Sequence, residues 1–242
     1  MCQMLTLNNI VKQYENGDGI NNISFSVKSG EIVGLLGANG AGKTTTLRCI
    51  CGLYSVEEGE VNLFGSSPNT NQSRKLTVFI PDSPYLYPTL TVAEHLQFKA
   101  KAFGVPKSEL RAKVQEALKE VNLESYADRP SGNLSRGQKQ RILLAAAYLQ
   151  EASLYLLDEP TVGLDIPSKQ WLAQWLKKNA ENQKSVIISS HSLDFVMETA
   201  NRVILIQQGK IINLHTVPTQ ETLLEPWRKA IIRELGGHIE DE

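Results

Sequence analysis

The chain has 242 residues, which is enough for one large α/β domain or for a core with an inserted subdomain. Its 25 Lys and Arg residues nearly balance 26 Asp and Glu residues, and the formal net charge of −1 gives no electrostatic footprint for nucleic acid, so no nucleic-acid partner is expected. The sequence starts without the pattern of a secretory signal and contains no apolar run of membrane-spanning length, so we expect a cytosolic protein.

Two segments near the N-terminus, residues 5–11 and 23–27, alternate apolar and polar residues, which is typical of strands. The turn-forming residues 16–19 lie between them, so the two strands are predicted to be antiparallel. Tyr14 follows the first strand, and its ring is a candidate for stacking on a purine base. Taken alone, Tyr14 would be better explained as an ordinary surface aromatic.

Residues 37–45 read Gly-Ala-Asn-Gly-Ala-Gly-Lys-Thr-Thr and match the phosphate-binding template G-x-x-x-x-G-K-[ST]. An apolar run of strand length precedes them, and residues 44–50 continue as a helix. The glycines allow successive N–H groups to point inward, and the helix N-terminus adds partial positive charge. We therefore predict a nucleoside triphosphate site, in which Lys43 reaches the β and γ phosphates and the Thr44 hydroxyl binds Mg²⁺; a plain glycine-rich turn is the alternative.

Two further strands, at residues 59–65 and 76–80, lead into a loop at residues 81–84, after which the pattern changes to helices. A capping box at residues 91–94 opens a helix that runs to about residue 103, and apolar residues at helical spacing mark a second helix over 110–121. A third helix follows residues 133–138, with Ser135 as its N-cap. The region of about 83–150 is thus predicted to be a helical insert.

The strand pattern returns at residues 154–157, which run directly into Asp158 and Glu159. Two carboxylates at the end of a buried strand are expensive to bury unless they face a cation, and Mg²⁺ is the obvious candidate. The next helix has Pro167 in its first turn, and we interpret Trp171 and Trp175 on it as core residues.

The next strand, at residues 185–189, ends just before His191, and Ser192 is expected to cap the helix that follows. Because ligands bind at the carboxyl ends of the strands in open α/β sheets, His191 is a candidate site residue. A hairpin is predicted over residues 203–214, and a short helix from Pro226 to Gly236.

In chain order, these motifs resemble those of the ATP-binding cassette (ABC) ATPases, and the resemblance extends to about residue 214. Tyr14 matches the adenine-stacking aromatic, and residues 37–45 match the Walker A loop. Residues 134–138, Leu-Ser-Arg-Gly-Gln, match the signature sequence. Asp158 and Glu159 match the Walker B pair, residues 163–165 the D-loop, and His191 the switch histidine.

The resemblance implies an α/β fold: a P-loop NTPase (RecA-like) core sheet with an N-terminal antiparallel β subdomain and an inserted helical subdomain. The ABC ATPase domain would span 1–215, with the core and antiparallel β part in 1–82 and 151–215 and the helical subdomain at about 83–150. Residues 216–242 would form a short C-terminal tail.

The resemblance also implies the cofactors ATP and Mg²⁺ and a division of roles among the residues. The catalytic residues would be Glu159 as general base, His191, Lys43 and Asp82; Mg²⁺ would be held by Thr44, Asp158 and Asp82. The nucleotide would contact Tyr14, Gly37, Ala38, Asn39, Gly40, Ala41, Gly42, Lys43, Thr44 and Thr45 of one chain and Ser135, Gly137 and Gln138 of a second chain.

Two positions depart from the family pattern. Asp82 takes the place of the glutamine that usually faces Mg²⁺ and the attacking water, which preserves a ligand for Mg²⁺ but adds negative charge near the γ-phosphate. Arg136 takes the place of a second glycine in the signature, and we interpret it as a tolerated surface substitution because Ser135, Gly137 and Gln138 are intact.

The function implied is that of an ATP-hydrolysing transporter subunit, peripheral on the cytoplasmic face of the cell membrane and bound to separate integral membrane subunits. It would form an ATP-sandwich dimer with a second ATPase chain, expected to be a copy of itself. Residues 86–96 and the Ser-Arg-Gly-Gln signature are most similar to bacterial ABC-2 type exporters of drugs, antibiotics or peptides. The alternatives are a soluble ABC ATPase acting on ribosomes or DNA, a low-activity ATP-binding partner in a heterodimer, and a small-molecule kinase.

Overall fold

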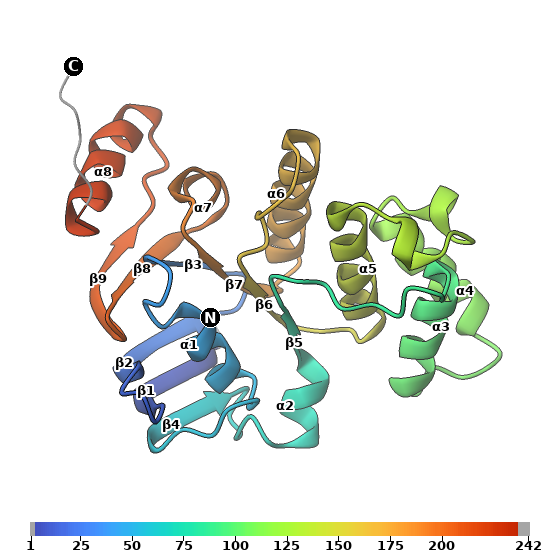
Figure 1. The fold of residues 1–242 in the computed structure, drawn as a ribbon, viewed down its shortest axis with the longest axis horizontal. Helices are drawn as coiled ribbons and strands as arrows, with labels where there is room; N and C mark the ends of the chain where they lie inside the picture. Colours follow the sequence, from blue (N-terminus) through green and yellow to red (C-terminus); the bar gives the residue numbers. More distant parts are fainter. Residues whose placement is uncertain (1–2, 237–242) are drawn as a thin grey trace.

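A six-stranded sheet forms the centre of the protein, whose computed structural model describes residues 3–236. Its strands are parallel apart from the last pair, which is an antiparallel hairpin, as the sequence predicts (Figure 1). In spatial order they are β5 (Thr77–Ile80), β6 (Leu154–Asp158), β7 (Ser185–Ser190), β3 (Ile32–Leu36), β8 (Arg202–Gln207) and β9 (Lys210–Thr216). The carboxyl ends of β5, β6, β7 and β3 therefore meet at one edge of the sheet.

The parallel strands are covered on both faces, which explains why they read as continuous apolar runs. In β3, Val33 and Leu35 pack in one hydrophobic cluster, while Ile32 and Leu36 pack in the other. Successive side chains of a strand point to opposite faces. The two clusters are therefore the two sides of one sheet.

One face of this sheet is covered by the phosphate-loop helix α1 (Lys43–Ile50) and a second, antiparallel sheet. That sheet has the order β2 (Gly19–Lys28), β1 (Gln3–Gln13), β4 (Glu58–Leu63), and it confirms the antiparallel pairing predicted for the N-terminal strands. Leu47 and Ile50 of α1 are fully buried between the two sheets. The helix that follows the phosphate loop is therefore packed between the two sheets.

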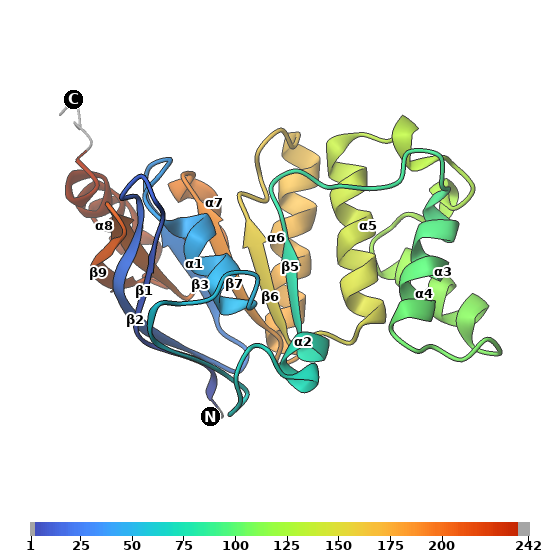
Figure 2. The same cartoon turned by 60° about the horizontal axis from the view of Figure 1, so that its bottom comes forward.

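The opposite face is covered by α6 (Ile166–Glu181) and α7 (Leu193–Thr199). Beyond α6 and β5 lie α5 (Arg136–Leu149), α3 (Val92–Ala102) and α4 (Leu110–Glu120), which pack against one another, with α5 also in contact with β5 (Figure 2). A reciprocal capping box of Thr91 and Glu94 starts α3, as predicted. Ser135 is the N-cap of α5, also as predicted, and Gln138 completes a second capping box that was not predicted. All three helices fall within the predicted insert; its status as a separate subdomain stays a prediction.

Three local features differ from the sequence prediction. A short helix, α2 (Asn71–Leu76), precedes β5, because the Thr70 hydroxyl accepts the hydrogen bond of the Ser73 N–H and caps a turn. The C-terminal helix α8 (Glu221–Glu234) begins five residues before Pro226 rather than at it, and buries Ile231 completely. Ser192 occupies the N-cap position of α7 but makes no side-chain capping bond.

Two 3-10 helices, Glu124–Tyr126 and Ser131–Asn133, connect α4 to α5. Within residues 3–236, no helix combines the length and apolar character needed to cross a membrane.

Gly34 in β3 provides a test of the packing. A β-carbon placed there would lie 2.3 Å from Cγ1 of Val196 in α7, so we expect Gly34→Ala to destabilise the protein by about 1–3 kcal/mol through overpacking. The midpoint of urea unfolding measures this effect. In a Val196→Ala background the added methyl group has room, so the same substitution should cost less. An equal cost in both backgrounds would contradict the packing described here.

Candidate functional site

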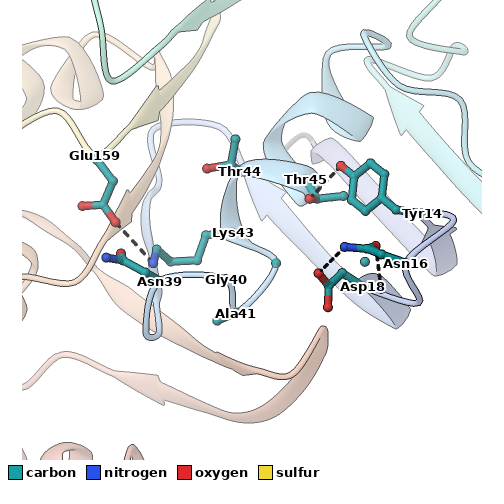
Figure 3. A pocket seen from close by; sticks show the side chains of 12 residues that line it. Tyr14, Asn16, Asp18, Asn39, Gly40, Ala41, Lys43, Thr44, Thr45 and Glu159 are labelled. Atoms are coloured by element: carbon teal, nitrogen blue, oxygen red, sulfur yellow. Dashed lines mark hydrogen bonds and ion pairs between the residues drawn. The ribbon is translucent and has the colours of Figure 1, made fainter.

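A cavity of about 470 Å³ opens at the carboxyl edge of the central sheet. It lies between the loop after β1, the loop after β3 with the start of α1, and the loop after β6 (Figure 3). The residues that line it are Tyr14, Asn16, Asp18, Gly19, Asn39, Gly40, Ala41, Gly42, Lys43, Thr44, Thr45 and Glu159. The structure therefore brings the predicted base-stacking aromatic, the phosphate loop and the predicted general base to one cavity.

Glycines set the shape of the phosphate loop. A β-carbon on Gly37 would lie 2.2 Å from the carbonyl oxygen of Ile206 in β8, and one on Gly42 would lie 2.8 Å from Cγ2 of Ile20. Gly42 also has φ +106°, a left-handed conformation that residues with a side chain rarely adopt. It is the N-cap residue of α1, so it directs the free N–H groups at the start of this helix toward the cavity.

The turn between β8 and β9 supports the same loop from behind. The N–H of Gly209 donates to the carbonyl oxygen of Ala41 at 3.0 Å, and the Gly209 carbonyl accepts from the N–H of Asn21 at 2.7 Å. A β-carbon on Gly209 would lie 2.4 Å from the carbonyl oxygen of Gly19. The phosphate loop, the start of β2 and the last hairpin of the core are therefore in direct backbone contact.

Lys43 is the buried cation of the site. Its Nζ donates to the carbonyl oxygens of Gly37 at 2.7 Å and Ala38 at 3.1 Å, and lies 3.2 Å from Oε1 of Glu159. Only 5% of the lysine side chain is exposed. Burial of an ammonium group requires polar partners, and here the loop carbonyls and the carboxylate supply them.

Asp158, at the end of β6, is 3% exposed and lies beside α1. Its Oδ1 accepts hydrogen bonds from the Thr44 hydroxyl at 2.9 Å and from the Ser189 hydroxyl at 2.5 Å. Ser189 Oγ also accepts the N–H of Glu159 at 3.0 Å. Ser189 orients both acidic residues, and the sequence identified it only as the last residue of a predicted strand.

Glu159 has φ +45°, which is strained for a residue with a side chain and turns its carboxylate back over the phosphate loop. Oε2 accepts the N–H of His191 at 3.3 Å and lies 2.9 Å from its Nδ1. Oε1 is buried and receives no well-directed hydrogen bond, although it lies within ion-pair distance of Lys43. The site thus contains a buried carboxylate oxygen that can accept a further hydrogen bond.

The other end of the cavity is bounded by Tyr14, whose hydroxyl lies 3.1 Å from Oγ1 of Thr45. The Tyr14 ring meets Tyr54 edge-on, with 6.1 Å between centroids, and 38% of the residue is exposed. Asn16 and Asp18, joined by a 2.7 Å hydrogen bond, also line this end. The sequence identified these two residues only as part of a turn, and nothing in that pattern signals that the turn faces the cavity.

The signature residues do not line this cavity. Ser135 is exposed, and its hydroxyl accepts the N–H of Gln138, whose Oε1 in turn accepts the N–H of Ser135. Gly137 is buried, and a β-carbon on it would lie 3.0 Å from the hydroxyl of Ser168 in α6. Asp165 caps α6 by accepting the N–H of Ser168, and hydrogen bonds from the side chain and then the N–H of Ser168 lower the pKa of the Asp165 carboxyl.

Asp82 also lies outside the cavity. Its side chain is exposed, and its nearest described partner is the hydroxyl of Ser83, which donates to Oδ2 at 3.5 Å. The described residues contain no group of three or more His, Cys, Asp or Glu residues placed to hold a metal ion. The oxygen atoms that the structure does gather are those of Thr44 and Asp158.

A family model described as ABC transporter matches residues 20–162. The chain belongs to the ABC transporter family. It is 53% identical, over 97% of its length and 98% of the relative, to the SkfA peptide export ATP-binding protein SkfE of Bacillus subtilis (strain 168). It is 36% identical to the linearmycin resistance ATP-binding protein LnrL of the same organism, over 88% of this chain and 69% of that protein.

Among solved structures, the dimeric post-hydrolysis state of an ATP-binding cassette bound to ADP and Pi matches with a TM-score of 0.79 and 28% identity. The match covers 90% of this chain and 100% of that one. The predicted P-loop NTPase fold and the assignment as an ABC ATPase, which binds and hydrolyses ATP, are confirmed. The roles of individual residues stay predictions.

Tyr14 offers a direct test of the base-binding end of this ABC ATPase. If the ring stacks on adenine, Tyr14→Ala should weaken ATP binding by about 1–2 kcal/mol, or about 5- to 30-fold in Kd. Tyr14→Phe keeps the ring and loses only the contact with Thr45, so it should bind ATP almost as the wild type does. Isothermal titration calorimetry measures both. Wild-type affinity in the alanine variant would place the base elsewhere.

Proposed function

We propose that this chain is the ATP-hydrolysing subunit of a bacterial exporter, works as a pair of identical cassettes, and binds separate integral membrane subunits at the cytoplasmic face of the cell membrane. Similarity to SkfE over nearly the full length of both chains supports a peptide as the class of cargo. The observation that carries the enzymatic part is the placement of Glu159 between Lys43 and His191, with a buried Oε1 that receives no well-directed hydrogen bond.

In this proposal Glu159 is the general base. A water molecule beside Oε1 would donate a hydrogen bond to this oxygen. The carboxylate would take the proton of the water as the water oxygen attacks the γ-phosphorus and the bond to the β-phosphate oxygen breaks, with ADP as the leaving group. Lys43 would exchange its loop carbonyls and Glu159 for phosphate oxygens and neutralise their charge. His191, held at Oε2, would keep the carboxylate oriented.

The residues present also fit Mg²⁺. This ion prefers oxygen ligands and is commonly bound through one or two carboxylates together with substrate phosphates, so a cluster of three acidic or imidazole side chains is not required. Thr44 and Asp158 supply a hydroxyl and a carboxylate, already within 2.9 Å of each other. When bound, the ion would neutralise phosphate charge. Asp82 joins this proposed ligand set only if the loop that carries it moves toward the cavity.

The N-terminus of α5 is proposed to complete the site of a second copy. Ser135 is exposed outside its own cavity, at a capped helix terminus with the partial positive charge that suits a phosphate. Ser135, Gly137 and Gln138 would thus contact the nucleotide bound by the other chain. The similarity to a dimeric cassette with bound ADP and Pi supports this arrangement.

A surface of exposed aromatic residues, Tyr85, Tyr87 and Phe98, is the proposed docking site for the membrane subunit. Tyr85 is 86% exposed, and Tyr87 and Phe98 are each 52% exposed. The rings of Tyr87 and Phe98 meet edge-on, with 6.3 Å between centroids. Aromatic residues are enriched in the buried centres of protein interfaces, so we call these three residues the aromatic patch and assign it to the membrane partner.

The enzymatic proposal predicts that Glu159→Gln lowers ATP turnover at least about 100-fold while ATP binding persists, because the amide keeps the shape but accepts no proton. The dimer with bound ATP should accumulate. Phosphate release and size-exclusion chromatography with ATP measure the two effects. Glu198→Gln, an equivalent change at an exposed position of α7, is the control and should leave turnover unchanged. Undiminished turnover of the Glu159 variant would refute its assignment as the base.

The transporter proposal predicts that the tagged chain, extracted from the membranes of its own cell in mild detergent, retains a polytopic membrane protein at near-stoichiometric yield. Mass spectrometry identifies what is bound. Replacing Tyr85 and Phe98 by Ser should reduce this yield without changing ATP binding, whereas Leu223→Ser on α8, also at an exposed apolar residue, should not. Recovery of ribosomes or nucleic-acid factors in place of a membrane protein would overturn the transporter proposal.

A further inference from the structure

Arg136 joins three segments that come from distant parts of the chain. It is the first residue of α5, and its Nη2 donates a hydrogen bond to the carbonyl oxygen of Asp82 at 2.5 Å, in the loop after β5. Its aliphatic stem lies against Gly163, in the loop after β6. The side chain is half-buried. The side chain therefore has specific partners on two loops, which the interpretation of Arg136 as a tolerated surface substitution did not include.

The position of this charge needs an explanation. The N-terminus of a helix carries partial positive charge, so a cation in the first turn is electrostatically unfavourable. Here the positive charge of the guanidinium is partly compensated by its hydrogen bond to the Asp82 carbonyl oxygen. Such a bond, from a charged donor to a carbonyl, is stronger than one between neutral groups. The arrangement uses the length and planarity of arginine, which a smaller residue lacks.

Gly163 is matched to this contact. A β-carbon built on it would lie 3.0 Å from Cδ of Arg136, closer than side chains normally approach. Gly163 also has φ +71°, which favours glycine. Gly137 and Leu164, the next residues along each segment, are also in close contact, since a β-carbon on Gly137 would lie 3.3 Å from Cδ2 of Leu164. The start of α5 is thus closely fitted to the loop between β6 and α6.

The two loops that Arg136 joins have different roles. The loop of residues 159–165 begins at Glu159, which lines the nucleotide cavity. The loop of residues 81–90 continues from Asp82 to Tyr85 and Tyr87 of the aromatic patch. Arg136 does not line the nucleotide cavity. One side chain therefore connects the segment at the hydrolysis site to the segment at the proposed docking surface.

We propose that Arg136 is a positioning residue that transmits the state of the Glu159 loop to the loop carrying Tyr85 and Tyr87, so that ATP binding changes the docking surface. This inference rests on the proposed function. A shift of residues 159–165 displaces the arginine stem at Gly163, and the guanidinium carries that displacement to the Asp82 carbonyl. Because Arg136 lies outside the nucleotide cavity of its own chain, its loss leaves ATP binding by that cavity intact and separates the two loops.

Hydrogen exchange of the purified full-length chain, with and without ATP and Mg²⁺, tests the proposal when combined with ATPase kinetics. In the wild type, ATP should change exchange both in residues 37–45 and in residues 82–90. In Arg136→Ala the first change should remain and the second should be lost, with KM within about twofold of wild type and kcat reduced about threefold or more. Arg136→Lys should restore part of the second change, since it can still donate to the Asp82 carbonyl.

Two further variants make the test independent of folding defects. Lys139→Ala removes a positive charge from the same end of α5 and should behave as wild type. Among residues 3–236, the one hydrogen bond of the Lys139 side chain goes to the carbonyl of Gly132 at 3.4 Å. Gly163→Ala should displace Arg136 and reproduce the loss at residues 82–90, with no further loss when combined with Arg136→Ala.

The outcomes separate the two proposals. If Arg136→Ala and Gly163→Ala keep the ATP-dependent change at residues 82–90, or if the wild type hydrolyses ATP without any such change, the inference about Arg136 is overturned and the proposed function stands. If the wild type fails to hydrolyse ATP, the proposed function is overturned instead. If Arg136→Ala does not fold, the Gly163→Ala variant decides the question by the same readout.

Discussion

The burial of two adjacent carboxyl groups at the end of β6 is the constraint on which the rest of the nucleotide edge depends. Asp158 is almost completely enclosed, and Glu159 is turned inward by a left-handed backbone conformation. Removing such groups from water is costly unless hydrogen bonds and opposite charges replace the solvent. The replacement comes from residues that follow or end two other strands: Lys43 and Thr44 after β3, and Ser189 and His191 at the end of β7. The parallel order of the sheet is what brings them to one place.

This arrangement also explains why the site can exchange its internal partners for a nucleotide. Lys43 is satisfied by two loop carbonyls and by Glu159, and each of these contacts resembles one that a phosphate oxygen can make. The buried Oε1 of Glu159 is the one acceptor among these groups without a directed hydrogen bond. An unsatisfied buried acceptor is unfavourable for stability, and such sites are commonly functional. The unfavourable burial of this acceptor thus lies at the atom to which the proposed chemistry assigns the proton.

Most strands and the core of the nucleotide site could be predicted because their signals are local. Buried parallel strands read as short apolar runs, and the phosphate loop needs its glycines and lysine at fixed spacing. The misses have the opposite character. Helix α2 depends on one Thr70 cap in a polar segment, and α8 continues through Pro226 because Ile231 is buried by residues distant in sequence. The hydrogen bond of Arg136 to Asp82 joins residues 54 positions apart in the sequence, and no pattern within either segment specifies it.

The contacts of the phosphate loop have a consequence for how the chain acquires its activity. Gly37 is shaped by the carbonyl of Ile206, and Ala41 is bonded to Gly209, so the loop takes its final form only when the last hairpin of the core is in place. Contacts between residues so far apart in sequence form late, because a long segment of chain must be ordered to make them. During synthesis the Walker A segment emerges early, but it lacks its supporting wall until β8 and β9 follow. Nucleotide binding is therefore coupled to completion of the core, and a partly made chain does not present a finished ATP site to its partners.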